Sequence, residues 1–120
     1  MQTLQIQSYS YQDRNRVLPV LMNAITRSGG WVLDRKSLSD LTLGFRVEIE
    51  LSGMLDLYSG IISSGLELTR SAHKSLTEMC MYSHHPRLVD PAQTVVIEME
   101  VSFIEDENLN AILMTGASAA

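Results

Sequence analysis

The chain has 120 residues, of which 45% are hydrophobic and 19% charged, the composition of a globular protein large enough for one domain with a single core. Its net charge of −5 and pI near 5.0 argue against a nucleic-acid partner, because phosphate-binding surfaces are normally basic. A single cysteine, Cys80, excludes an internal disulfide, the first residues lack a signal-peptide pattern, and no apolar run approaches the ~20 residues that cross a bilayer. We therefore expect a cytoplasmic protein without membrane contact.

The chain opens with a predicted strand followed by a helix. Residues 3–11 alternate with a period of two, which is typical of a strand. The polar residues 12–15 predict a turn, and the side-chain oxygen of Asn15 suits a helix N-cap. Apolar residues at helical spacing then predict a helix that ends at Gly29–Gly30. Pro19 is expected in its first turn, where its missing N–H costs nothing.

Two further strands are predicted before the middle of the chain. Residues 31–34 alternate, and the polar and charged residues 35–40 that follow indicate an exposed or edge strand. Trp31, at the start of this strand, is expected to lie in the core rather than at a dimer contact. Residues 45–51 form the clearest alternation in the chain, with one apolar and one charged face.

The next segment contains a choice between two helices and one. Residues 54–64 predict a helix capped by Gly65, residues 66–70 a strand, and residues 71–82 another helix. Apolar spacing also permits one continuous helix as far as Met81. We favour the break, because each glycine inside a helix costs roughly 1 kcal/mol relative to alanine.

The remaining residues predict one more strand. A loop covers residues 87–93, residues 94–104 alternate between apolar and mainly acidic positions, residues 109–114 predict a short helix, and residues 115–120 a frayed end.

An internal repeat supports this order of elements. Leu21 to Arg35 and Leu57 to Arg70 share the pattern Leu, three residues, Ile, two residues, Ser, Gly, followed by an alternating segment that ends in Arg. Two similar strand–helix–strand halves predict an α+β fold of the ferredoxin-like βαββαβ type, with the helices on one face of an antiparallel sheet. Residues 1–70 would form this core, and residues 71–120 would add a helix and a strand packed on the same domain.

Three places resemble ACT-type domains, which are small regulatory modules of amino-acid metabolism. They are the turn Asp13–Leu18, the helix end Ser28–Gly30 and the sequence Ser64–Leu66. The family's ligand turn usually reads Asp-Arg-Pro-Gly, whereas here Asn and Arg replace Pro and Gly. The resemblance implies a ferredoxin-like fold and a homodimer that binds an amino acid.

Carried over position by position, the resemblance implies five contact residues. Asp13, Asn15 and Arg16 would meet the ligand in the turn, and Gly29 and Gly30 would lie near the partner subunit.

Metal and catalytic sites are not predicted. The soft-metal candidates are His73, Cys80, His84 and His85, which we interpret as a buried thiol and solvated imidazoles because zinc needs three or four convergent ligands.

The carboxylates Glu48, Glu50, Glu98 and Glu100 are interpreted as the wet face of the sheet, although hard-cation binding or acid–base chemistry remains an alternative. We expect no cofactor.

The resulting hypothesis is a non-enzymatic regulatory or amino-acid-binding domain that dimerises through edge strands or helices. One alternative is a structural dimerisation module without a ligand. Another is a small metal-dependent enzyme that uses the polar face of the sheet.

Overall fold

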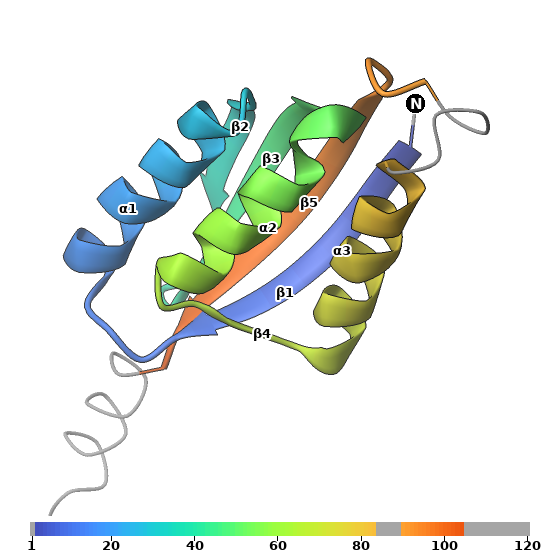
Figure 1. Ribbon diagram of the computed structural model, residues 1–120. Helices are drawn as coiled ribbons and strands as arrows, with labels where there is room; N and C mark the ends of the chain where they lie inside the picture. Colours follow the sequence, from blue (N-terminus) through green and yellow to red (C-terminus); the bar gives the residue numbers. More distant parts are fainter. Residues whose placement is uncertain (1, 84–89, 105–120) are drawn as a thin grey trace, which may run out of the picture.

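The computed structural model describes residues 2–83 and 90–104, which form one five-stranded sheet and three α-helices (Figure 1). The predicted α+β class is confirmed. In chain order the elements are β1 (Gln2–Ser10), α1 (Arg14–Arg27), β2 (Trp31–Ser37), β3 (Thr42–Glu50), the 3-10 turn η1 (Leu51–Gly53), α2 (Met54–Ser63), β4 (Glu67–Leu68), α3 (Arg70–Ser83) and β5 (Thr94–Phe103).

The last strand lies in the middle of the sheet. The strand order is β2-β3-β5-β1-β4, so β5 separates β1 from β3. β5 runs parallel to β1 and antiparallel to β3, and the sheet is therefore mixed rather than antiparallel as predicted. The reason is burial: β5 is rich in valine, isoleucine and methionine and is buried at most of its positions, and such a strand is more stable between two neighbours than at an edge.

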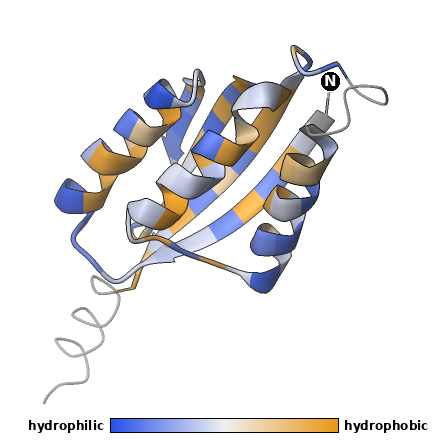
Figure 2. Cartoon of the chain, in the orientation of Figure 1, coloured by the Kyte–Doolittle hydropathy of each residue, from blue (hydrophilic) through white to orange (hydrophobic). Residues whose placement is uncertain are grey.

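All three helices cover the same face of the sheet, as predicted, and no helix of the described residues covers the other face, here called the open face (Figures 1 and 2). Leu21 of α1, Leu57 of α2 and Leu76 of α3 are almost completely buried and belong to the same core cluster as alternate residues of the strands. The predicted alternation of β1 is confirmed, since Ile6 and Ser8 are buried while Gln5 and Gln7 are exposed. The exposed polar side chains that alternate with these buried residues lie on the open face.

The internal repeat corresponds to two equivalent helix ends. Ser28 caps α1 and Ser64 caps α2, and each buried hydroxyl donates to the backbone carbonyl three residues earlier, at 2.7 and 2.6 Å respectively. The glycines that follow, Gly29 and Gly65, have φ values of 87° and 91°. This left-handed conformation is easy only for glycine, so Gly65 breaks the chain into two helices and the continuous-helix alternative is wrong.

The start of α1 differs from the prediction. Asp13, not Asn15, is the N-cap residue, and its backbone carbonyl accepts hydrogen bonds from the N–H groups of Arg16 and Val17. Because the helix begins at Arg14, Pro19 falls in the second turn rather than the first. There its ring nitrogen cannot donate to the carbonyl four residues earlier.

Trp31 is 49% exposed, so its predicted place in the core is wrong. It lies opposite Glu48 on the open face of the edge strand β2, where no second layer covers it.

Some predictions fall outside the described residues: the histidines at 84 and 85, the loop from 87 to 89, the short helix at 109–114 and the frayed end. Within the described part of the chain, no helix is both long and apolar enough to cross a membrane.

Candidate functional site

The predicted ligand turn joins β1 to α1, and its three candidate residues are exposed. Asp13, Asn15 and Arg16 occupy the cap and first turn of α1. The neighbouring Arg14 holds the turn in place, because its guanidinium donates to the carbonyl of Asp40 at 2.9 Å and lies 4.7 Å above the ring of Phe103. The turn is thereby attached to the β2–β3 loop and to the end of β5.

The two candidate glycines lie at the opposite end of α1. A helix of 14 residues is about 20 Å long, so a single chain does not bring Gly29 and Gly30 near the turn. Gly30 is buried, and a Cβ atom there would come within 3.2 Å of the Glu48 carbonyl and 3.3 Å of the Ile25 side chain. Close packing of α1 against β3 therefore leaves little room for a larger side chain at this position.

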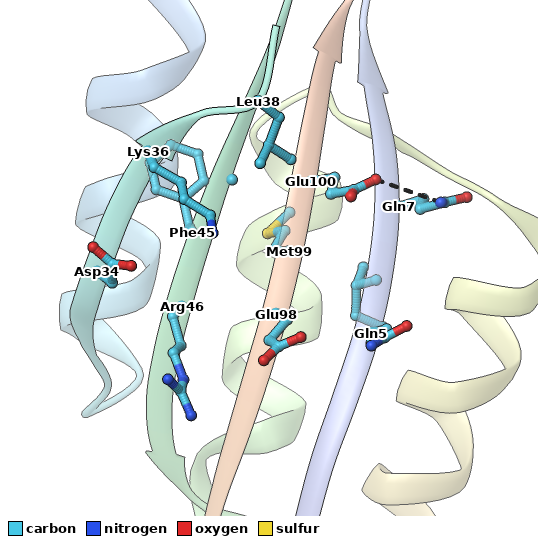
Figure 3. Close-up of a pocket in the computed structure, with 12 residues that line it drawn as sticks. Gln5, Gln7, Asp34, Lys36, Leu38, Phe45, Arg46, Glu98, Met99 and Glu100 are labelled. Carbon is cyan, nitrogen blue, oxygen red and sulfur yellow. Dashed lines mark hydrogen bonds between the residues drawn. The ribbon is translucent and has the colours of Figure 1, made fainter.

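The open face of the sheet is arranged in rows that run across the strands. One row contains Asp34 of β2, Arg46 of β3, Glu98 of β5 and Gln5 of β1. The next row contains Lys36, Gly44, Glu100 and Gln7 on the same four strands. The two cations, Lys36 and Arg46, therefore stand on β2 and β3, whereas the carboxylates stand on β5 and, at Asp34, on β2 (Figure 3).

These two rows line a concavity of about 320 Å³ on the open face. Gly44 has no side chain, which leaves a gap in the second row between Lys36 and Glu100. Leu38, from the loop after β2, reaches over this gap, with its Cδ1 atom 3.2 Å from the point where a Cβ of Gly44 would stand. The Gln7 amide donates to the Glu100 carboxylate at 3.4 Å (Figure 3).

The four carboxylates considered for a metal share the open face but do not converge. Glu48 lies opposite Val96 and Glu50 opposite Thr94, whereas Glu98 lies opposite Arg46. The acidic pair on β3 and the acidic pair on β5 are thus offset from each other along the strand direction. Among residues 2–83 and 90–104, no three His, Cys, Asp or Glu side chains lie together as a metal site would require.

His73 and Cys80 both lie on α3 but take part in different contacts. The His73 Nδ1 atom is 2.8 Å from the hydroxyl of Tyr58 on α2, and the two rings meet edge to face. Cys80 is buried, and burial raises the pKa of its thiol. His73 and Cys80 thus help to join α3 to α2 and to the core.

A second concavity, of about 340 Å³, lies between α1 and α2. Its lining includes Gly60 and Ala24, where the two helices pack so closely that a Cβ on Gly60 would stand only 2.7 Å from that of Ala24.

Sequence reasoning did not select the residues around the open-face concavity, namely Gln5, Gln7, Lys36, Leu38 and Gly44. The alternation of the strands indicates which side chains share this face, but the pairing of strands distant in sequence decides which of them are neighbours. Comparison of the chain with protein-family models, with curated proteins and with solved structures gave no match.

Proposed function

We propose that this protein is a non-enzymatic regulatory domain that binds an amino-acid-like ligand and acts as a homodimer. The observation that carries the proposal is the position of the candidate residues relative to the exposed edge strand β2. The turn with Asp13 and Arg16 lies beside the end of β2, to which Arg14 is bonded through Asp40, and Gly29 and Gly30 lie beside its start.

Two copies paired antiparallel through β2 would bring these two groups together. In that arrangement the start of one β2 strand lies next to the end of the other, so the turn of one copy approaches the glycines of the second copy. A site made of both groups, which a single chain separates by the length of α1, would then form at the interface.

The chemistry of the β2 edge supports such pairing. Trp31, Leu33 and Leu38 are exposed to 49%, 47% and 44%, and within the described residues β2 pairs only with β3. An edge strand with unpaired backbone groups and three exposed apolar side chains gains from being covered.

We also propose that the fold is a ferredoxin-like arrangement with one strand inserted. β2 with β3 and β1 with β4 form antiparallel pairs, and the helices that follow β1 and β3 lie on one face. Removing β5 from the order leaves β2-β3-β1-β4, which is the order of a split βαβ fold.

The first test is the mass in solution of the wild-type chain and of Leu33→Lys, measured by sedimentation equilibrium. Leu33 is exposed in an irregular part of β2, so the substitution leaves the core intact. We expect a dimer for the wild type and a monomer for the variant. A wild-type monomer would contradict the dimer, and a dimeric variant would place the interface elsewhere.

The second test is a thermal-shift screen with amino acids, in which a ligand at 100 times its dissociation constant adds about 2.7 kcal/mol to stability. We expect Arg16→Ala to abolish the shift and Lys74→Ala, an exposed cation on α3, to leave it unchanged. A dimer without any shift would instead make the protein a structural dimerisation module. A shift with a divalent metal alone would favour a metal-dependent enzyme.

A further inference from the structure

The open-face concavity differs from the proposed turn site in place and in chemistry. It lies in the middle of the sheet, on the side away from all three helices, and it is lined by polar and charged side chains of four strands (Figure 3). It shares Leu38 with the exposed edge at β2, but its charged residues on β3 and β5 lie away from that edge. It therefore has to be considered as a site of its own.

The two charges beside the gap at Gly44 are available for a ligand. Arg46 stands between Asp34 and Glu98 in its row and has carboxylates on both sides. Lys36 lies opposite Gly44, which has no side chain, and Asp34 lies two residues before it on the same face of β2; within the described residues its ammonium makes no hydrogen bond or ion pair. Glu100 receives a single long hydrogen bond from a neutral amide.

The spacing of these charges restricts the ligand. Lys36 and Glu100 belong to strands two apart, so their Cα atoms are separated by about 10 Å across the sheet. Leu38 lies over the gap and forms an apolar surface between the two charges. A molecule that meets both charges has an anionic and a cationic end several bonds apart and an apolar part between or beside them.

We propose that this concavity binds a small dipolar ligand of the dipeptide or ω-amino-acid class. Its carboxylate pairs with the ammonium of Lys36, its protonated amine pairs with the carboxylate of Glu100, and its apolar part packs on Leu38. Leu38 fills the space above Gly44, so the ligand lies over Leu38 between the two charges. This site does not include the turn at Asp13, but it shares β2 and Leu38 with the proposed dimer edge.

The test is a titration of the full-length protein with glycyl-leucine, followed by backbone amide NMR and by calorimetry. We expect shifts centred on residues 36, 44 and 100. N-acetyl-glycyl-leucine, which lacks the cation, and glycyl-leucine amide, which lacks the anion, should each bind at least tenfold more weakly.

Two variants assign the charges. Lys36→Gln should weaken the binding of glycyl-leucine at least tenfold, and this variant should no longer bind glycyl-leucine more tightly than glycyl-leucine amide. Glu100→Gln should no longer bind glycyl-leucine more tightly than N-acetyl-glycyl-leucine. Lys74→Gln on α3 is the matched control and should bind as the wild type does. Lys36 is exposed and Glu100 lies on the open face, so circular dichroism should show that both variants fold.

Three results would overturn the proposal. The first is the absence of amide shifts with glycyl-leucine, leucine and 6-aminohexanoate alike. The second is equal affinity of the wild type and both variants for glycyl-leucine. The third is shifts confined to the start of α1, which would support the turn site and leave the concavity without a ligand.

Discussion

Ser28 and Ser64 show how single side chains end a helix in this protein. Each hydroxyl is buried, and each would be costly without a partner, but both donate to a carbonyl within the last turn. The next residue must then adopt a positive φ, which favours glycine. A buried serine followed by a glycine with positive φ therefore ends the helix in both copies of the internal repeat.

Cys80 provides a prediction at this scale. Burial raises the pKa of its thiol, and the thiolate is the reactive form, so alkylation by iodoacetamide at neutral pH should be far slower in the folded than in the urea-unfolded chain. Below the ordinary thiol pKa of about 8.5, neither state is ionised and the thiol contributes no pH dependence. Above it, the unfolded chain ionises first, and the free energy of unfolding should fall as pH rises.

The control is Cys80→Ala, compared with the wild type by urea denaturation at several pH values. The stability advantage of the wild type over this variant should shrink between about pH 8 and about pH 10. A constant difference across that range would show that the thiol ionises equally in both states.

The packing of α1 on α2 depends on the absence of one methyl group. Because Gly60 has no Cβ, the two helices approach so closely that a Cβ there would clash with the Cβ of Ala24. Gly60 lies within α2, where glycine is otherwise unfavourable. Close helix packing thus outweighs local helix propensity at this position.

A double-mutant cycle tests this balance. Gly60→Ala should lower the free energy of unfolding by about 1–3 kcal/mol in the wild type, because the added methyl overpacks the contact. In an Ala24→Gly background the same change should instead raise it by up to about 1 kcal/mol, through better helix propensity. Urea denaturation measures both values. The same sign in the two backgrounds would exclude a direct contact between the positions.

The position of β5 makes the whole molecule depend on its last described strand. β1 and β3 each pair with β5 along most of their length and do not pair with each other. Phe103, Ile97 and Val101 of β5 are among the most deeply buried side chains in the core. The two strand–helix–strand halves are therefore held together by a segment that follows both of them.

It follows that a chain of residues 1–70 should not fold alone. This fragment lacks both α3 and β5, so two long strands lose a neighbour and the core loses the buried side chains of both elements. They are Ala72, Leu76, Met79 and Cys80 of α3 and Val95, Ile97, Met99, Val101 and Phe103 of β5. We expect this fragment to show no cooperative thermal transition by circular dichroism, unlike the full chain. A cooperative transition would mean that β1 and β3 pair directly when β5 is absent.

The candidate site was only partly predictable. The family resemblance selected Asp13, Asn15 and Arg16, which the structure places together at the start of α1, and Gly29 and Gly30, which it places at the other end. The open-face concavity was not predicted, because it depends on Gly44 lying between Lys36 and Glu100. These three residues come from segments far apart in the sequence.

Local periodicity and turn chemistry were enough to predict the type and order of the elements and both glycine helix ends. These features depend on neighbours within a few residues, and the sequence therefore determines them by itself. The place of β5 between β1 and β3, the exposure of Trp31 and the offset of the acidic pairs were decided only by the tertiary structure. Pairing between distant strands is a competition for burial across the whole chain, and no local pattern records its outcome.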